Sequence, residues 1–197
     1  LANPRLKCAE NRAQEPRVRG RRLVLTMQLT KHHGLGNDFL VLLDPDGTAD
    51  VTAELAVALC HRHTGVGADG LLVAGPPTAG AEVSMVLLNA DGSRAEMSGN
   101  GIRVLVQAVL RAGLVTGPVV RVATDAGLRT VTLVAEVDDR TQRFSVEMGP
   151  AKVGERAEAW IAGDIADAVT VDMGNPHLVA RWSGAQLPAR DELVALG

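Results

Sequence analysis

The chain has 197 residues, a formal net charge of -3 and a hydrophobic content of 46%. This composition is typical of a globular protein, and the length allows one full domain and part of a second. Its aromatic residues are two Phe and two Trp, which leaves no stacking surface for single-stranded nucleic acid. No apolar run approaches the roughly 20 residues that cross a bilayer, so we expect no membrane or nucleic-acid partner.

The N-terminal segment differs from the rest of the chain. Residues 1–26 hold seven basic and two acidic residues, a balance of +5, and subtracting this from -3 leaves -8 for the remainder. The segment lacks periodicity, and its longest apolar stretch is too short for a signal peptide. We therefore predict a basic leader, disordered or not native to the domain, and favour this over a nucleic-acid-binding arm. The two cysteines, Cys8 and Cys60, form no disulfide framework and predict a reduced, cytoplasmic protein.

After the leader, the pattern becomes that of a folded protein. We expect a strand, a glycine-rich turn at 34–37 and a second strand over 39–43. Asp50 or Thr52 can cap a helix that runs to about His63. Further strands are expected over 71–75, 81–90, 119–124, 129–137 and 143–149.

A helix predicted from about Asn100 to Ala112 is apolar around most of its circumference. Its polar stripe is narrow, with Arg103, Gln107 and Arg111 spaced four residues apart. A helix of this kind is buried on most sides. We therefore predict an α+β fold in which antiparallel or mixed strands wrap around this central helix. The first lobe is expected over 27–146, and 147–197 would form an incomplete second lobe.

Metal and phosphate sites are not predicted. Four histidines, at His32, His33, His61 and His63, lack the spacing to a carboxylate or a cysteine pair that metal sites use. We interpret them as structural or surface residues. The glycine-rich stretches resemble neither a dinucleotide-binding fingerprint nor a P-loop, so no cofactor is expected.

Ser98 stands directly before the central helix. It lacks the context of a nucleophile elbow, because Glu96 occupies the position where that motif needs glycine. Serine is a preferred N-cap. The following Gly99 and Asn100 leave backbone N–H groups at the positive end of the helix, which suits a carboxylate or phosphate. A thiol at this position would have a lowered pKa.

Four stretches, taken in order, resemble the diaminopimelate epimerase family: KHHGLGNDF, HRHTGVGADGLL, NADGSRAEMSGNGIR and, at 173–179, MGNPHLV. The resemblance implies two similar α+β lobes with an active site in the cleft between them. It also implies cofactor-independent interconversion of LL- and meso-diaminopimelate, a step towards lysine and peptidoglycan precursors, and a homodimer. Two cysteines would exchange the α-proton on opposite faces of the substrate.

The resemblance also assigns site residues. The first catalytic cysteine of the family lies in the motif MCGNG, where this sequence has Ser98 between Met97 and Gly99. The second lies in the later lobe on another glycine-rich helix start, which does not occur before Gly197. Substrate binding through side-chain amides and helix N–H groups would fall to Asn37, Asn89, Gly99, Asn100 and Asn175.

The serine leads to a specific expectation: the site binds diaminopimelate without epimerising it. An introduced substitution, a natural homologue that lost the thiol and a member with another base all remain open. Cys60 is expected in the core, Gly70 stands where some members have glutamine, and His177 is either structural or lines the cleft. One alternative is a non-catalytic amino-acid-binding homologue. Another is a proline racemase-like isomerase, and the motifs NADGS and MGNPH argue against this second alternative.

Overall fold

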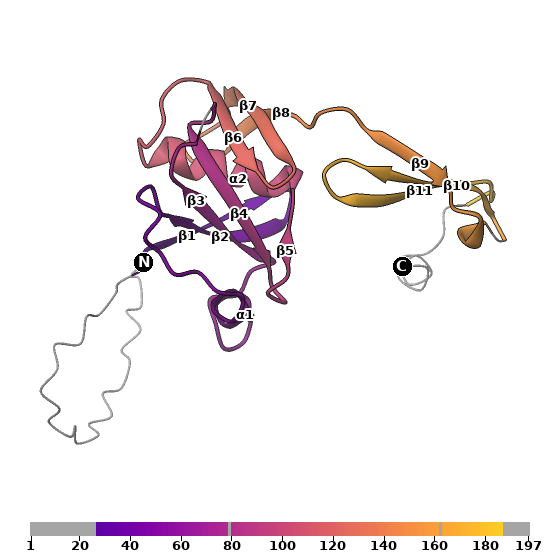
Figure 1. The fold of residues 1–197 in the computed structure, drawn as a ribbon, viewed down its shortest axis with the longest axis horizontal. Helices are drawn as coiled ribbons and strands as arrows, with labels where there is room; N and C mark the ends of the chain where they lie inside the picture. The colour runs from indigo at the N-terminus through magenta and orange to yellow at the C-terminus, as the bar shows by residue number, and fades with distance from the viewer. Residues whose placement is uncertain (1–26, 79, 162, 187–197) are drawn as a thin grey trace, which may run out of the picture.

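The computed structural model describes residues 27–186 except 79 and 162. The predicted leader and the last part of the expected second lobe lie outside the described residues. Within them, an eight-stranded sheet has the order β1-β2-β3-β4-β6-β7-β8, with β5 paired to β4 (Figure 1). Its strands are β1 (Leu29–Gly34), β2 (Asn37–Leu43), β3 (Gly70–Gly75), β4 (Val83–Asn89), β5 (Arg94–Ala95), β6 (Val119–Thr124), β7 (Gly127–Glu136) and β8 (Gln142–Glu147).

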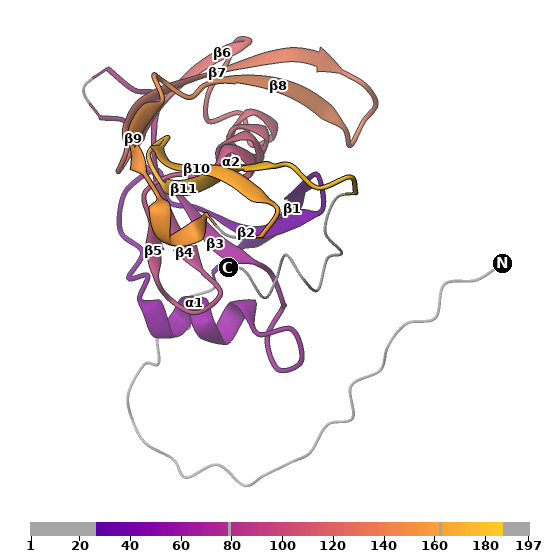
Figure 2. The ribbon, with the colours of Figure 1, turned by 90° about the vertical axis from the view of Figure 1, so that its right-hand side faces the viewer.

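The large sheet curls around α2 (Gly99–Arg111), which lies between β6–β8 and β1–β4 (Figure 2). Four apolar side chains of this helix are fully buried, each with 0% of its surface exposed: Ile102, Leu105, Val106 and Val109. The pairs β2–β3 and β4–β6 are parallel and the others in this sheet are antiparallel. The predicted α+β fold, mixed strands around one buried helix, is confirmed.

The turn between β1 and β2 is shorter than the sequence predicted. Only Leu35 and Gly36 lie outside the strands, with φ of 57° and 93°. Two successive residues with positive φ form the kind of tight hairpin turn that matches strand twist. The predicted turn over 34–37 is therefore corrected, and Asn37 is the first residue of β2.

The first helix, α1 (Ala53–Cys60), ends three residues before the predicted His63. Thr52 caps it as one of the two expected candidates, since its Oγ1 accepts a hydrogen bond from Leu55 N at 3.2 Å. After Cys60, the ring Nδ1 of His61 accepts hydrogen bonds from backbone N–H groups of its own loop, which competes with continuation of the helix. Cys60 is only 1% exposed and packs between α1 and the sheet, as expected, and burial raises the pKa of its thiol.

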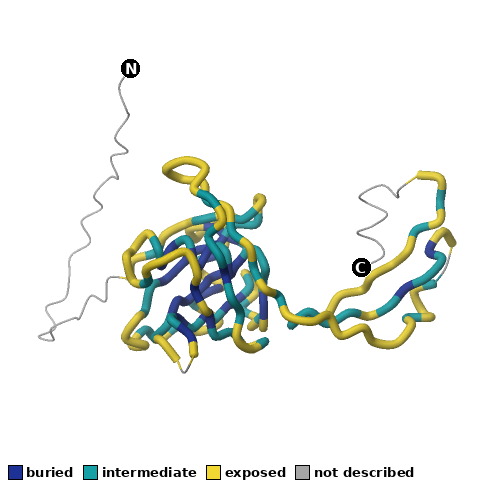
Figure 3. Tube along the Cα trace, turned by 90° about the horizontal axis from the view of Figure 1, so that it is seen from above, coloured by how far each residue is buried: buried dark blue, intermediate teal, exposed yellow. Residues whose placement is uncertain are grey.

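A second, three-stranded sheet has the order β11-β10-β9 and extends away from the first (Figures 1 and 3). It comprises β9 (Lys152–Arg156), β10 (Ile165–Asp172) and β11 (Pro176–Trp182), with a short 3-10 helix, η1 (Glu158–Trp160). Gly174 in the β10–β11 turn has a φ of 96°, and a Cβ there would lie 2.6 Å from Ala126 Cβ. Only glycine therefore allows this turn to approach Ala126, in the β6–β7 turn of the large sheet, so closely.

Candidate functional site

A cavity of about 1100 Å³ lies at the N-terminal end of α2. It is bounded by residues of the large sheet, by the start of α2 and by the β10–β11 turn. Its polar lining includes Asn37, Asp69, Asn89, Ser98, Gly99, Asn100, Arg103 and Asn175. The structure thus brings all six residues that the sequence nominated into one cavity. Gly70 and His177 are not among its lining residues.

Ser98 is the N-cap of α2. Its backbone is extended, with φ of -143°, and its Oγ accepts a hydrogen bond from Gly101 N at 3.0 Å. The N–H groups of Gly99 and Asn100 belong to the first turn, where α-helical donors have no acceptor inside the helix. Within the described residues, the Gly99 and Asn100 N–H groups have no hydrogen-bond acceptor outside the helix either. These donors and the helix dipole suit a bound carboxylate.

The side-chain amides of Asn89 and Asn175 line the cavity, and in each of them one polar group already makes a hydrogen bond within the protein. Asn89, at the end of β4, donates from Nδ2 to Ser93 Oγ at 3.0 Å, which leaves its amide oxygen for a ligand. Asn175 accepts at Oδ1 from the His177 ring Nε2 at 3.0 Å, which leaves its NH₂ group. His177 is exposed, is not among the residues that line the cavity, and orients Asn175. Of the two roles expected for His177, a structural residue or a residue of the cleft, this position fits the structural one.

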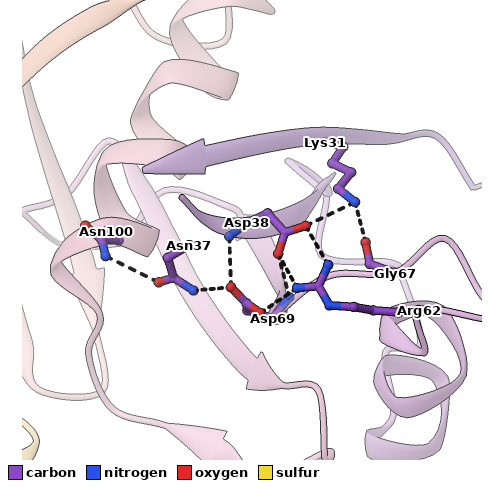
Figure 4. Close-up of polar contacts among 7 residues, drawn as sticks. All are labelled: Lys31, Asn37, Asp38, Arg62, Gly67, Asp69 and Asn100. Carbon is purple, nitrogen blue, oxygen red and sulfur yellow. Dashed lines mark hydrogen bonds and ion pairs between the residues drawn. The ribbon is translucent and has the colours of Figure 1, made fainter. Parts of the chain in front are cut away.

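An ionic cluster lies beside Asn37 (Figure 4). The Arg62 guanidinium donates to Asp38 Oδ1 at 2.7 Å and to Asp69 Oδ1 at 2.6 Å. Lys31 Nζ lies 3.1 Å from Asp38 Oδ2. Hydrogen bonds from Arg62, and then from Lys31, hold the pKa of Asp38 well below its usual range. Asp69 Oδ2 accepts from Asn37 Nδ2 at 2.7 Å and from the backbone N–H of Asp38 at 3.0 Å.

A second row of polar contacts connects Asn37 to α2. Asn100 Nδ2 lies 3.4 Å from Asn37 Oδ1, and the Arg103 guanidinium donates to Asn100 Oδ1 (Figure 4 shows the first contact). The contacts of Asp69, Arg62 and Arg103 beside the cavity were not predicted from the sequence. Asp69 and Arg62 lie in a motif that carried the resemblance, but only the pairing of β2 with β3 reveals that Asp69 touches Asn37.

The histidines do not converge on a shared site. His32 Nδ1 lies 2.8 Å from Gln107 Oε1, and the His61 ring contacts Thr64 Oγ1 at 2.8 Å. Among the residues that the structure describes, no group of three or more His, Cys, Asp or Glu side chains is placed to hold a metal ion. The helices in this part of the chain are too short or too polar to span a membrane.

Comparisons with known proteins agree with the resemblance. A family model described as diaminopimelate epimerase matches residues 29–154. A protein named diaminopimelate epimerase from Thermobifida fusca is 39% identical, over 79% of this chain and 60% of that protein. One of the same name from Corynebacterium aurimucosum is 41% identical, over 78% of this chain and 59% of its own length. The chain therefore spans about 60% of the length of these relatives.

Solved structures show the same fold at lower identity. A probable proline racemase from Agrobacterium radiobacter K84, with bound carbonate, has a TM-score of 0.57 and 22% identity. The match covers 79% of this chain and 52% of that one. A hydroxyproline epimerase from Agrobacterium vitis, with bound trans-4-hydroxy-L-proline, has a TM-score of 0.52 and 22% identity, over 78% and 51% of the two chains. At this level of identity the likeness concerns the fold.

Proposed function

Because the chain belongs to the diaminopimelate epimerase family, we propose that it binds diaminopimelate in the cavity at the start of α2. The convergence of helix N–H groups and asparagine amides on this one cavity carries the proposal. The Gly99 and Asn100 N–H groups would hold the α-carboxylate. The amides of Asn37, Asn89 and Asn175 would take the ammonium groups and the distal carboxylate of the substrate.

The whole protein would then be a cofactor-independent epimerase. One base removes the α-proton from one face, and the electron pair of the broken C–H bond remains on the carbanion. A conjugate acid on the other face returns a proton and inverts the centre. The α2 N-terminus stabilises the charge that develops on the adjacent carboxylate. Residue 98 would serve one face, and a second lobe, to which we assign β9–β11, would supply the opposing acid.

Serine at this position changes the expected outcome. An alcohol is a much weaker acid than a thiol, and a helix N-terminus contributes only about 0.3–2 kcal/mol, roughly one pKa unit. The Ser98 hydroxyl is also engaged as an acceptor for Gly101 N. We therefore expect this chain to bind diaminopimelate without epimerising it. The hydrogen bond from Gly101 N to Ser98 Oγ also supports the second candidate function, a non-catalytic amino-acid-binding protein, because it gives the serine a role in capping α2.

Titration of the purified chain with LL- and meso-diaminopimelate, combined with α-proton exchange in deuterated water, tests the proposal. We expect binding of both isomers, with no inversion and no exchange. Ser98→Cys should allow exchange without inversion, since one thiol serves one face; in a longer chain with an opposing thiol it should restore turnover. Conversion of LL- to meso-diaminopimelate by this chain, abolished by Ser98→Ala, would show that serine is the working base. Absence of binding to either isomer would refute the proposed substrate.

A proline racemase-like activity is the remaining alternative. The solved racemase and epimerase structures are 22% identical to this chain, whereas the diaminopimelate relatives reach 39–41%. Competition with proline during the same titration separates the two substrates. The homodimer stays a prediction from the resemblance, and the cytoplasmic location stays a prediction from cysteine usage.

A further inference from the structure

The polar groups around Asn37 can hydrogen-bond in only one arrangement. An ionised carboxylate only accepts hydrogen bonds, so Asp69 Oδ2, 2.7 Å from the Asn37 amide, requires the NH₂ group on its side. The Asp38 N–H, which donates to the same oxygen at 3.0 Å, fixes the position of this carboxylate. With the opposite amide orientation, two acceptor oxygens would face each other at hydrogen-bond distance. Asn37 Oδ1 therefore points away from Asp69, towards α2.

The hydrogen bonds that begin at Asp69 and run through the Asn37 and Asn100 amides end at a cation, the Arg103 guanidinium. A guanidinium only donates, so Arg103 requires the oxygen of the Asn100 amide on its side. The NH₂ group of Asn100 then faces Asn37 Oδ1, at 3.4 Å. The assignment of oxygen and nitrogen in an asparagine amide is ordinarily ambiguous. Here an acceptor-only ion at one end and a donor-only ion at the other fix both amides, although neither ion belongs to the same element as Asn37.

We propose that Asp69 and Arg103 are positioning residues that fix Asn37 Oδ1 as an acceptor for the α-ammonium group of the substrate. This inference rests on the proposed function, since Asn37 is expected to bind the substrate there. The oxygen lies next to the first turn of α2, where the Gly99 and Asn100 N–H groups suit the α-carboxylate. A zwitterionic amino-acid head group would thereby bind in one orientation. Its carboxylate would lie at the N-terminus of α2, and its ammonium group would lie at the Asn37 amide oxygen.

Arg62 supports Asp69 from outside the cavity. Its guanidinium bridges Asp69 Oδ1 and Asp38 Oδ1, so the Asp69 side chain is held by an ion pair on one oxygen while the other oxygen serves Asn37. Asp38 shares the charge and the Arg62 partner of Asp69, but its side chain makes no hydrogen bond to the Asn37 amide within the described structure. Asp38→Asn is therefore a matched control for Asp69→Asn.

The test compares meso-diaminopimelate with pimelate, which has the same carbon chain and both carboxylates but no ammonium groups. In the wild-type chain we expect diaminopimelate to bind more tightly. Asp69→Asn permits either orientation of the Asn37 amide, so the ratio of the two Kd values should fall by about tenfold, the scale of one hydrogen bond to a charged group. Asp38→Asn should leave the ratio unchanged. Arg103→Lys, which keeps a donor, should retain the ratio better than Arg103→Met.

A purely structural role predicts a different pattern. Damage to the fold would weaken both ligands by the same factor, so an unchanged ratio in Asp69→Asn overturns the inference. NMR of the side-chain amides gives a readout without ligand. The Asn37 NH₂ protons should show a nuclear Overhauser effect to the backbone N–H of Asp38, which Asp69→Asn weakens; its absence in the wild-type chain would also overturn the inference. If the wild-type chain binds no diaminopimelate, the proposed substrate fails, and this NMR result separately decides the orientation of the amide.

Discussion

Replacement of Ser98 separates the stability of α2 from ligand binding. The Ser98 Oγ accepts the Gly101 N–H at 3.0 Å, and Ser98→Ala removes this cap. Loss of an N-cap costs about 1 kcal/mol, within a range of roughly 0.5–2 kcal/mol. For a domain of this size, that corresponds to a drop in Tm of about 2–4 °C. The effect should reach the whole large sheet, because α2 contributes many of the side chains in the core that this sheet surrounds.

Ser98→Asp has the opposite balance. The aspartate keeps an acceptor for Gly101 N and adds a negative charge at the positive end of the helix, so stability should equal or exceed that of the wild type. Two like charges about 4 Å apart repel by about 4 kcal/mol at an effective dielectric constant of about 20. Even a quarter of that repulsion, about 1 kcal/mol, weakens binding of the substrate carboxylate about fivefold.

Urea unfolding and isothermal titration with meso-diaminopimelate measure the two effects on the same samples. We expect Ser98→Ala to lower stability with a small effect on affinity. For Ser98→Asp we expect retained stability and weaker binding, with a larger Kd. If Ser98→Asp binds diaminopimelate as tightly as the wild type, the carboxylate does not lie at the start of α2, and the assignment of Gly99 and Asn100 as its donors is wrong.

Three further predictions concern the core, the β10–β11 turn and the surface charges. Leu105→Ala should lower the free energy of unfolding by about 2–5 kcal/mol, because the side chain is 0% exposed, whereas Leu35→Ala at a 92% exposed site should change it little; urea unfolding checks both. Gly174→Ala should weaken diaminopimelate binding because it displaces the turn that carries Asn175, while the matched Gly117→Ala, at a similar φ of 92° but with no atom within 4 Å of the added Cβ, should affect stability alone; equal affinity losses would contradict this. The pKa of Glu82 is lowered to about 2, mainly by hydrogen bonds from Arg121. A folded-state pKa below the unfolded one means that this carboxylate stabilises the fold above the unfolded value and loses its contribution as pH falls towards about 2. Glu82→Gln should therefore destabilise the chain at about pH 7 and have less effect at about pH 3, as measured by unfolding at each pH; an equal effect at both would contradict the ion-pair explanation.

The central helix was predictable because burial leaves a direct pattern in sequence. The apolar positions of α2 surround it, and the residues that the pattern selected are fully buried. The boundaries of other elements depend on contacts that the pattern does not contain. The end of α1 follows from the His61 ring, which accepts backbone hydrogen bonds in the next turn. The two-residue strand β5 is too short to show any periodicity and exists only because β4 pairs with it.

Residues that line the cavity were predictable from the sequence, but the contacts between them were not. The resemblance supplied Ser98 and the three asparagines, and helix capping supplied the anion site that we propose at the start of α2. Neither could supply the contact between Asn37 and Asp69, which are 32 residues apart and adjacent only in the folded sheet. Charged residues such as Asp69 and Arg62 most often lie on solvated surfaces, and their place in a motif that carried the resemblance does not show what they contact.

The strand register explains why these polar residues meet at one place. In the parallel pair β2–β3, Phe39 lies opposite Gly70, and in the antiparallel pair β3–β4, Gly70 lies opposite Asn89. The start of β2, the start of β3 and the end of β4 therefore share one end of the sheet, beside the start of α2. Strands β2 and β3 are apolar on both faces, whereas buried positions largely alternate along β4. A slip of one residue would turn Val83, Met85 and Leu87 away from the core around α2, so burial fixes the register of β4. The apolar packing of β4 thus sets where the Asn89 amide lies relative to the N–H groups at the start of α2.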